Sequence, residues 1–123
     1  MTNFKSLVSG VGSLKKTKKY YNDWSKDYDK TLKIWNYQAP KKSSQFLKNI
    51  KKIRAKNILD LACGTGLFGT ELKKLYPKSI IYGSDISKQS LKIAYTKNIY
   101  YDLKVKNFEQ FNYQKINLIL FLL

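Results

Sequence analysis

A glycine-rich stretch near the middle of the chain constrains the fold more than any other feature. It reads NILDLACGTGLFG over residues 57–69, and Gly64, Gly66 and Gly69 match the spacing G-x-G-x-x-G. The apolar run before the glycines predicts a strand, and the residues after them have helical spacing. Glycines at such a turn let a ligand approach the backbone, whose N–H groups line a concave site at the start of the helix. The stretch therefore predicts a binding site at the carboxyl end of a strand.

The rest of the chain alternates between helix and strand patterns, and two helices come first. Apolar spacing predicts helices over residues 20–35, 40–53, 67–76 and 88–97. Short apolar or alternating runs predict strands over residues 57–61, 80–83, 100–106 and 116–123. Pro40 suits the first turn of a helix, and Ser87 is a suitable N-cap. Strands that alternate with helices predict an α/β fold with a doubly wound, mostly parallel sheet.

The charge of the chain is strongly positive, with a formal net charge of +16. Its lysines are scattered from Lys5 to Lys115, and Arg54 is the only arginine. Because proteins that read nucleic acid usually use arginine for bidentate contacts, we favour a solvated basic surface over a polyanion site. Nucleic acid is thus a partner that the sequence allows but does not favour.

Several classes of site and location are excluded by what the sequence lacks. It has one cysteine, Cys63, and no histidine, so it can form neither an internal disulfide nor an ordinary zinc site. A thiol nucleophile at Cys63 would have no histidine to activate it. No apolar run is long enough to span a bilayer and no signal peptide is evident, so we expect a cytoplasmic protein without a metal.

Two aspartates discriminate between the ligands that such a turn could bind. Asp85 ends the second predicted strand about nineteen residues after Gly66, where a carboxylate can accept both hydroxyls of a ribose. Asp60 lies just before the glycines, and a carboxylate there would repel a pyrophosphate by several kcal/mol. The same carboxylate favours an ammonium or a sulfonium. The pair therefore favours S-adenosylmethionine over a dinucleotide, and Gly69 then only allows close packing within a helix.

These motifs resemble those of a known family. LDLACGTG (59–66) and GSDIS (83–87) are similar to the first two motifs of the class I S-adenosylmethionine-dependent methyltransferases. YYNDWSKDYDKTLKIWNYQAPKK (20–42) is similar to the start of the methyltransferase-like proteins named after the Williams–Beuren syndrome chromosomal region. The resemblance covers residues 20–123. It implies a Rossmann-like class I methyltransferase fold that uses S-adenosylmethionine.

The resemblance also implies roles for the residues that match the motifs. Asp60 would orient the turn and meet the methionine ammonium, directly or through water. Asp85 would hold the ribose hydroxyls, and Tyr28, with Trp24 nearby, would close the site from the N-terminal helix. Backbone atoms would line the methionine and ribose at Ala62, Cys63, Gly64 and Gly66. The adenine would lie against Ile86, Asn107 and Phe108.

Four positions depart from the family pattern. Ala62 replaces a glycine, and Ser90 stands where many relatives have a methionine against the adenine. Asn107 and Asn117 replace aspartates, although the carbonyl of Asn107 can still accept from the adenine amine. No residue can be assigned as catalytic, because the family's substrate-binding half has no counterpart in this chain.

The expected organisation is a basic flexible leader over residues 1–19 and a cofactor-binding domain over residues 20–123, with a helical lid over 20–54. An apolar central strand over 116–123 normally leads into another crossover, so we expect a sheet truncated after its fourth strand. The first hypothesis is a methyltransferase acting on a small molecule. The alternatives are an inactive cofactor-binding remnant or a module completed by a partner and, less favoured, a basic nucleic-acid-binding protein.

Overall fold

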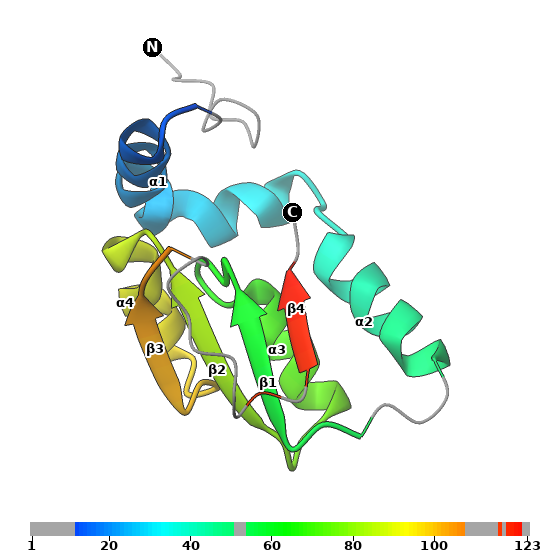
Figure 1. The fold of residues 1–123 in the computed structure, drawn as a ribbon. Helices are drawn as coiled ribbons and strands as arrows, with labels where there is room; N and C mark the ends of the chain where they lie inside the picture. The colour runs from blue at the N-terminus through cyan, green and yellow to red at the C-terminus, as the bar shows by residue number, and fades with distance from the viewer. Residues whose placement is uncertain (1–11, 51–53, 108–115, 117, 122–123) are drawn as a thin grey trace.

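A computed structural model describes residues 12–50, 54–107, 116 and 118–121. In these residues two helices precede two strand–helix units, and two further strands follow (Figure 1). In chain order the elements are α1 (Leu14–Ile34), α2 (Ala39–Asn49), β1 (Asn57–Leu61), α3 (Leu67–Leu75), β2 (Ile80–Asp85), α4 (Lys88–Thr96), β3 (Asp102–Val105) and β4 (Leu118–Phe121).

The described strands form one parallel sheet in the order β3-β2-β1-β4. In its register Leu59 pairs with Tyr82 on one side and with Ile119 on the other. In chain order, β2 and β3 lie on one side of β1, and β4 then lies on its other side. The carboxyl end of β1 is therefore a topological switch point, the place where open α/β sheets bind their ligands. The predicted α/β fold with a parallel sheet is confirmed.

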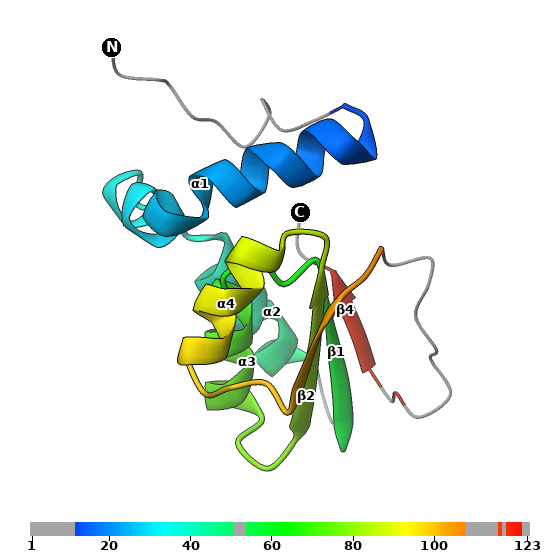
Figure 2. The ribbon, with the colours of Figure 1, turned by 90° about the vertical axis from the view of Figure 1, so that its left-hand side faces the viewer.

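Helices α2, α3 and α4 lie on one side of this sheet (Figure 2). The core between helices and sheet is formed by Leu47, Ala55, Ile58, Phe68, Leu72 and Ile81. Alternate residues of a strand point to the same face. Asp60 therefore shares the helix-covered face of β1 with Ile58, and this places a carboxylate at the end of an otherwise apolar row.

Helix α1 crosses above the carboxyl ends of the strands (Figure 1) and packs mainly against α4. It begins at Leu14, within the segment expected to be a leader, because the Ser13 hydroxyl caps it by accepting from the Lys16 N–H at 3.3 Å. Its inward face carries buried apolar side chains: Trp24 and Leu32 are each 2% exposed. Of the segment predicted as a helical lid, α1 lies above the carboxyl ends of the strands, whereas α2 packs against α3 beside the sheet. A role of this segment as a lid stays a prediction.

Most element boundaries lie within a few residues of those predicted. Ser87 caps α4 as expected, since its hydroxyl accepts from the Ser90 N–H at 3.1 Å. The third strand is shorter than predicted because Tyr100 precedes it and packs beneath α3 instead of pairing in the sheet. Residues 51–53, at the end of the second predicted helix, lie outside the described part of the chain.

Candidate cofactor-binding site

The turn between β1 and α3 has a left-handed backbone at alternate residues. Ala62, Gly64 and Gly66 have φ angles of 53°, 57° and 91°. A Cβ built on Gly64 would meet no atom within 4 Å, so the missing side chain leaves open space beside the backbone. The turn is anchored to β2, because the Cys63 N–H donates to the Ser84 carbonyl at 3.0 Å. The result is a fixed turn with an open side at Gly64.

Asp85 holds this turn from the neighbouring strand. Its Oδ2 accepts from the Gly64 N–H at 2.9 Å, and its Oδ1 accepts from the Ser87 N–H at 2.8 Å. Burial raises the pKa of Asp85, while hydrogen bonds from the backbone of Ser87, Gly64 and Ile86 lower it, and the net shift is upward. Each carboxylate oxygen has two lone pairs, so Asp85 can still accept hydroxyl donors from a ligand.

Asp60 lies beneath the turn and is 1% exposed. Its Oδ2 accepts from the Tyr100 hydroxyl at 2.6 Å. Burial raises the pKa of Asp60 to about 7, the charge of Asp85 raises it as well, and the hydrogen bond from Tyr100 lowers it. The carboxyl therefore changes protonation near neutral pH. In this structure its partner is Tyr100, and contact with a ligand's ammonium stays a prediction.

The glycines of the G-x-G-x-x-G spacing have two kinds of surroundings. A Cβ on Gly66 would lie 3.2 Å from Cε2 of Tyr100, and a Cβ on Gly69 would overlap the Tyr100 hydroxyl. Gly83 of β2 is similar, with its Cβ position 2.9 Å from Cδ1 of Tyr100. Only Gly64 of the spacing opens to the outside. The expectation that Gly69 allows close packing is confirmed, and Tyr100 is the group that packs there.

Comparison with known proteins identifies the family to which this chain belongs. The family profile "Methyltransferase small domain" matches residues 36–118, which is more than half of the 123 residues and contains β1, β2 and β3. The chain belongs to the methyltransferase small domain family.

Individual relatives agree with this family. The chain is 36% identical over 81 residues to malonyl-[acyl-carrier protein] O-methyltransferase of Legionella pneumophila, a match that covers 64% of this chain and 27% of that protein. The crystal structure of an S-adenosylmethionine-dependent methyltransferase from Clostridium acetobutylicum superposes with a TM-score of 0.59 at 27% identity, over 82% of this chain and 43% of that one. The plantazolicin methyltransferase BpumL in complex with SAH superposes with a TM-score of 0.55 at 22% identity, over 92% of this chain and 43% of that one.

These solved structures establish a Rossmann-like methyltransferase fold for the described elements. The chain spans less than half the length of each of these three proteins.

In this member of the methyltransferase small domain family, α1 is tied to the site by two polar side chains. Asn22 Oδ1 accepts from the Ser87 hydroxyl at 2.6 Å and from the Gln89 N–H at 3.3 Å. Asp29 accepts from the Thr65 hydroxyl within the glycine turn and, at 2.6 Å, from Lys97 Nζ beyond the end of α4. The helix is therefore attached at both ends of α4 and to the turn itself.

Two tyrosines of α1, Tyr21 and Tyr28, interact electrostatically with Asp85. Burial is the main cause that raises the pKa of Tyr28, and the charge of Asp85 acts in the same direction. The pKa of Tyr21 is raised in the same way, by burial first and by Asp85 among other groups. Both phenols therefore stay protonated. Tyr28 was expected in this region, whereas Tyr21 was not.

The Trp24 ring packs against the rings of Tyr28 and Trp35. Trp24 is 2% exposed, its ring centroid lies 4.7 Å from that of Tyr28 and 5.8 Å from that of Trp35, and its Nε1–H donates to the Thr31 hydroxyl at 3.3 Å. The buried Trp24 ring therefore supports the Tyr28 ring by packing against it.

The residues expected around the adenine lie along the same edge of the sheet. Ile86 follows β2 and Asn107 follows β3, and both are half-buried. The Lys106 N–H donates to the Asp85 carbonyl at 3.1 Å, which brings the connection after β3 beside Asp85. Phe108 and Asn117 lie outside the described residues.

Cys63 is a structural thiol of the turn. It is 7% exposed, and burial, Asp60 and Asp85 hold its pKa well above the usual range. A protonated, buried thiol is a poor nucleophile. Within the described part of the chain, no group of three or more His, Cys, Asp or Glu residues could hold a metal ion.

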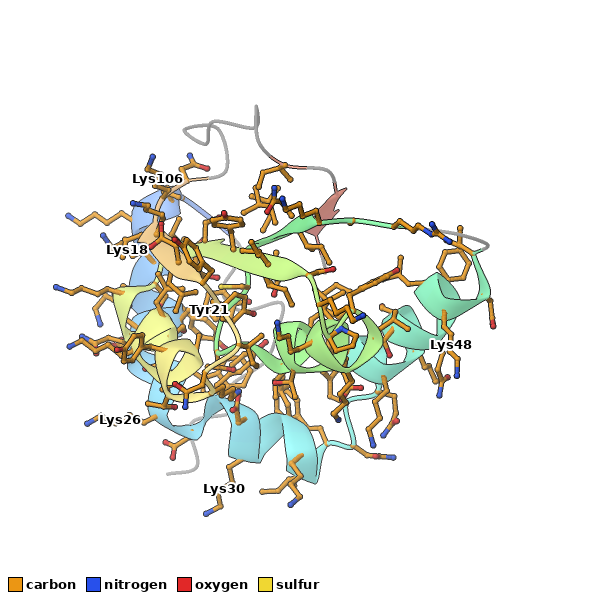
Figure 3. All side chains as sticks on the ribbon, turned by 90° about the horizontal axis from the view of Figure 1, so that it is seen from below. Lys18, Tyr21, Lys26, Lys30, Lys48 and Lys106 are labelled. Atoms are coloured by element: carbon orange, nitrogen blue, oxygen red, sulfur yellow. The ribbon has the colours of Figure 1, made fainter. Side chains whose placement is uncertain are left out.

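Lysines spread over several elements and do not gather at the turn. Figure 3 labels Lys18, Lys26 and Lys30 of α1, Lys48 of α2 and Lys106 after β3, and Lys26 and Lys30 point outward from α1. This distribution agrees with a solvated basic surface. No helix in the described residues is long and apolar enough to cross a membrane.

Sequence reasoning missed three polar residues that organise the site: Asn22, Asp29 and Tyr100. Asn22 and Asp29 are seven residues apart, so they share a face of α1, and that spacing beside the aromatic stripe was an available signal. Tyr100 had no comparable signal, since its partner Asp60 is 40 residues away in the sequence.

Proposed function

We propose that this chain binds S-adenosylmethionine at the carboxyl ends of β1 and β2 and belongs to an enzyme that transfers its methyl group. The observation that carries the proposal is the Asp85 carboxylate, held 2.9 Å from the Gly64 N–H at the open side of a left-handed turn. A ribose can reach this carboxylate because nothing fills the space where a Gly64 side chain would be.

The charges of the site fit this cofactor better than a dinucleotide. Asp60 lies below the turn and Asp85 beside it, and among the described residues no arginine pairs with either carboxylate. A pyrophosphate would be repelled by these carboxylates, whereas a sulfonium or an ammonium would be attracted. S-adenosylmethionine has an adenosine and both cations, and it has no phosphate.

Each contact residue then has a proposed role. Asp85 holds the ribose hydroxyls, and Asp60 acts on the methionine ammonium, directly or through water. Tyr28 closes the site from α1. Backbone of the turn lines the methionine and ribose at Ala62, Cys63, Gly64 and Gly66. The adenine lies among Ile86, Asn107 and Phe108.

When bound, the cofactor supplies an electrophilic methyl group. The protein's own contribution is to align that methyl group with a nucleophile and to exclude water. Helix α1 is suited to the second task, because Asn22 and Asp29 attach it to α4 and to the turn above the carboxyl ends of the strands. No described residue is assigned as a general base.

The methyl acceptor that we propose is a small molecule. The names of similar structures support this, since they include the plantazolicin methyltransferase BpumL. The resemblance of residues 20–42 to the Williams–Beuren region proteins supports membership of that subgroup. The single cysteine supports a cytoplasmic location, since it allows no internal disulfide and suits a reducing compartment.

Calorimetric titration with S-adenosylmethionine and with S-adenosylhomocysteine tests the binding site. We expect both to bind, NAD⁺ to bind far more weakly, and Asp85→Ala to lower the affinity at least tenfold, because hydrogen bonds to a charged acceptor contribute about 1.5–3 kcal/mol. Asp102→Ala is the matched control, since Asp102 is a surface aspartate of β3 paired with Lys104.

The proposal fails if the folded wild-type chain binds neither ligand, or if the two variants bind equally well. Formation of S-adenosylhomocysteine with a panel of small amines, acids and phenols would test transfer. Binding without transfer to any acceptor would favour the cofactor-binding module over the enzyme.

A further inference from the structure

Tyr100 occupies a slot that three glycines form beneath the cofactor turn. The slot is made by Gly66 at the start of α3, Gly69 in its first turn and Gly83 in β2, and a Cβ on any of them would press on the tyrosine ring or hydroxyl. Three of the six glycines in the chain are therefore adjacent to one aromatic side chain. Such a fit is specific to the ring's position, because a shift of the ring in any of these directions would meet backbone.

The hydroxyl of Tyr100 is directed at the buried groups below the turn. It donates to Asp60 Oδ2 at 2.6 Å. Asp60 lies on the helix-covered face of β1, directly before the turn, and the Tyr100 ring lies beside Gly66 at the end of the turn. Tyr100 thus contacts both the strand before the turn and the turn itself.

We infer that Tyr100 is a positioning residue for the cofactor site: its ring spaces α3 from β2, and its hydroxyl fixes Asp60 and the turn in the arrangement that binds S-adenosylmethionine. The inference rests on the proposed function. Tyr100 then affects cofactor binding without contacting the cofactor itself.

The hydroxyl, more than the ring, connects Tyr100 to binding. A ring alone would fill the slot, as phenylalanine could. Among the described residues, the Tyr100 hydroxyl is the hydrogen-bond donor to the Asp60 carboxylate. Without a donor, a buried carboxyl group favours its protonated form. A protonated Asp60 offers a cation no opposite charge. Tyr100 therefore controls whether Asp60 can assist a cationic ligand.

Three titratable groups face Asp60, and each must be considered in a pH experiment. They are Tyr100 from the connection before β3, Cys63 from the turn and Asp85 from the end of β2. Tyr100 and Cys63 have pKa values well above their usual ranges, so neither titrates near neutral pH. Asp85 is common to the wild type and to a Tyr100 variant, so a difference between those two proteins reports on Asp60.

The test compares Tyr100→Phe with Tyr101→Phe by titrating S-adenosylmethionine into each at several pH values. Tyr101 is adjacent in sequence but 76% exposed, which makes it a matched control. For the wild type we expect affinity about tenfold higher at about pH 8 than at about pH 6, because Asp60 becomes charged in this interval. Tyr100→Phe should lower the affinity about tenfold at about pH 8 and move the rise to higher pH. Tyr101→Phe should do neither.

Asp60→Asn distinguishes positioning from simple packing. It leaves a carbonyl oxygen that can accept from Tyr100 but removes the titrating group. Affinity in this variant should lose the tenfold rise, and adding Tyr100→Phe should then have little further effect on it. A purely structural tyrosine would instead lower the free energy of unfolding by the same amount in both backgrounds and leave the pH profile of affinity unchanged.

The outcomes separate this inference from the proposed function. If the folded wild type does not bind S-adenosylmethionine, both are wrong. If it binds, and Tyr100→Phe binds equally well with the same pH profile, only the role of Tyr100 is wrong. If Tyr100→Phe does not fold, the wild type is compared with Asp60→Asn instead. Identical pH profiles of affinity would overturn the inference, whereas a difference confined to the interval around pH 7 would support it.

Discussion

Asp60 makes the stability of the folded chain depend on pH in a way that one substitution should remove. Folding raises the pKa of this carboxyl from 3.8 to about 7, chiefly through burial. A carboxyl whose pKa is raised binds a proton more tightly in the native than in the unfolded chain. Stability is therefore lost as the pH rises from the unfolded to the native pKa, and it changes no further above the native pKa.

The size of the effect follows from the same values. Between about pH 5 and about pH 7 the native carboxyl is protonated and the unfolded carboxyl is charged. Each pH unit in that interval costs about 1.4 kcal/mol of the free energy of unfolding, so two units cost about 3 kcal/mol. This is a large fraction of the 5–15 kcal/mol that is roughly typical of a folded domain.

Asp60→Asn is the perturbation that isolates this effect. The amide does not titrate, yet its oxygen can accept the hydrogen bond from Tyr100. Urea unfolding of both proteins, followed by tryptophan fluorescence, should give a difference in unfolding free energy that changes by about 3 kcal/mol from about pH 5 to about pH 8, with Asn favoured at the higher pH.

Asp102→Asn is the control, because Asp102 is a surface carboxylate whose side chain is 43% exposed. Its pH profile should run parallel to that of the wild type. The reasoning is refuted if the profile of Asp60→Asn also runs parallel to the wild type within about 1 kcal/mol. That result would mean that Asp60 is as well solvated when folded as when unfolded.

Three other substitutions and one chemical probe test the remaining contacts. Gly69→Ala should destabilise by about 1–3 kcal/mol in urea unfolding, since its Cβ overlaps Tyr100; a neutral or stabilising change would contradict the slot. Ala62→Gly should stabilise by up to about 1 kcal/mol, because φ is 53° at an exposed residue, and a loss of stability would argue against that backbone. Asp29→Asn should increase proteolysis of α1 more than Asp27→Asn does, because only Asp29 pairs with Lys97; equal rates would show that the pair does not hold the helix. Cys63 should react slowly with thiol reagents until urea unfolds the chain, and rapid labelling of the native protein would show that the turn opens.

The order of elements was predictable because its signals are local. Ser87 before a helical pattern predicted the start of α4, and the apolar run before the glycines predicted β1. The position of Asp85 beside the glycine turn was predictable for the same reason, since it ends the neighbouring strand. Helix α1 was predicted too short at its N-terminus because the Ser13 cap lies in a lysine-rich segment without an apolar stripe.

The environment of Asp60 was not predictable in the same way. The sequence placed it at the end of β1 and suggested a carboxylate facing an open crevice. In the structure α3 covers that face of β1, and Tyr100 reaches Asp60 from 40 residues further along the chain. The contact between Asp29 and Thr65 spans 36 residues and was missed for the same reason.

Strand ends, helix caps and a glycine turn are properties of a few consecutive residues, and the sequence by itself determined them and the parallel α/β fold that they imply. Only the tertiary structure decided which glycines leave open space and which make room for another side chain. The sequence shows a glycine at both Gly64 and Gly69 and does not show what lies where a Cβ would be. What fills the space beside it depends on side chains from distant elements: open space at Gly64, and the Tyr100 hydroxyl at Gly69.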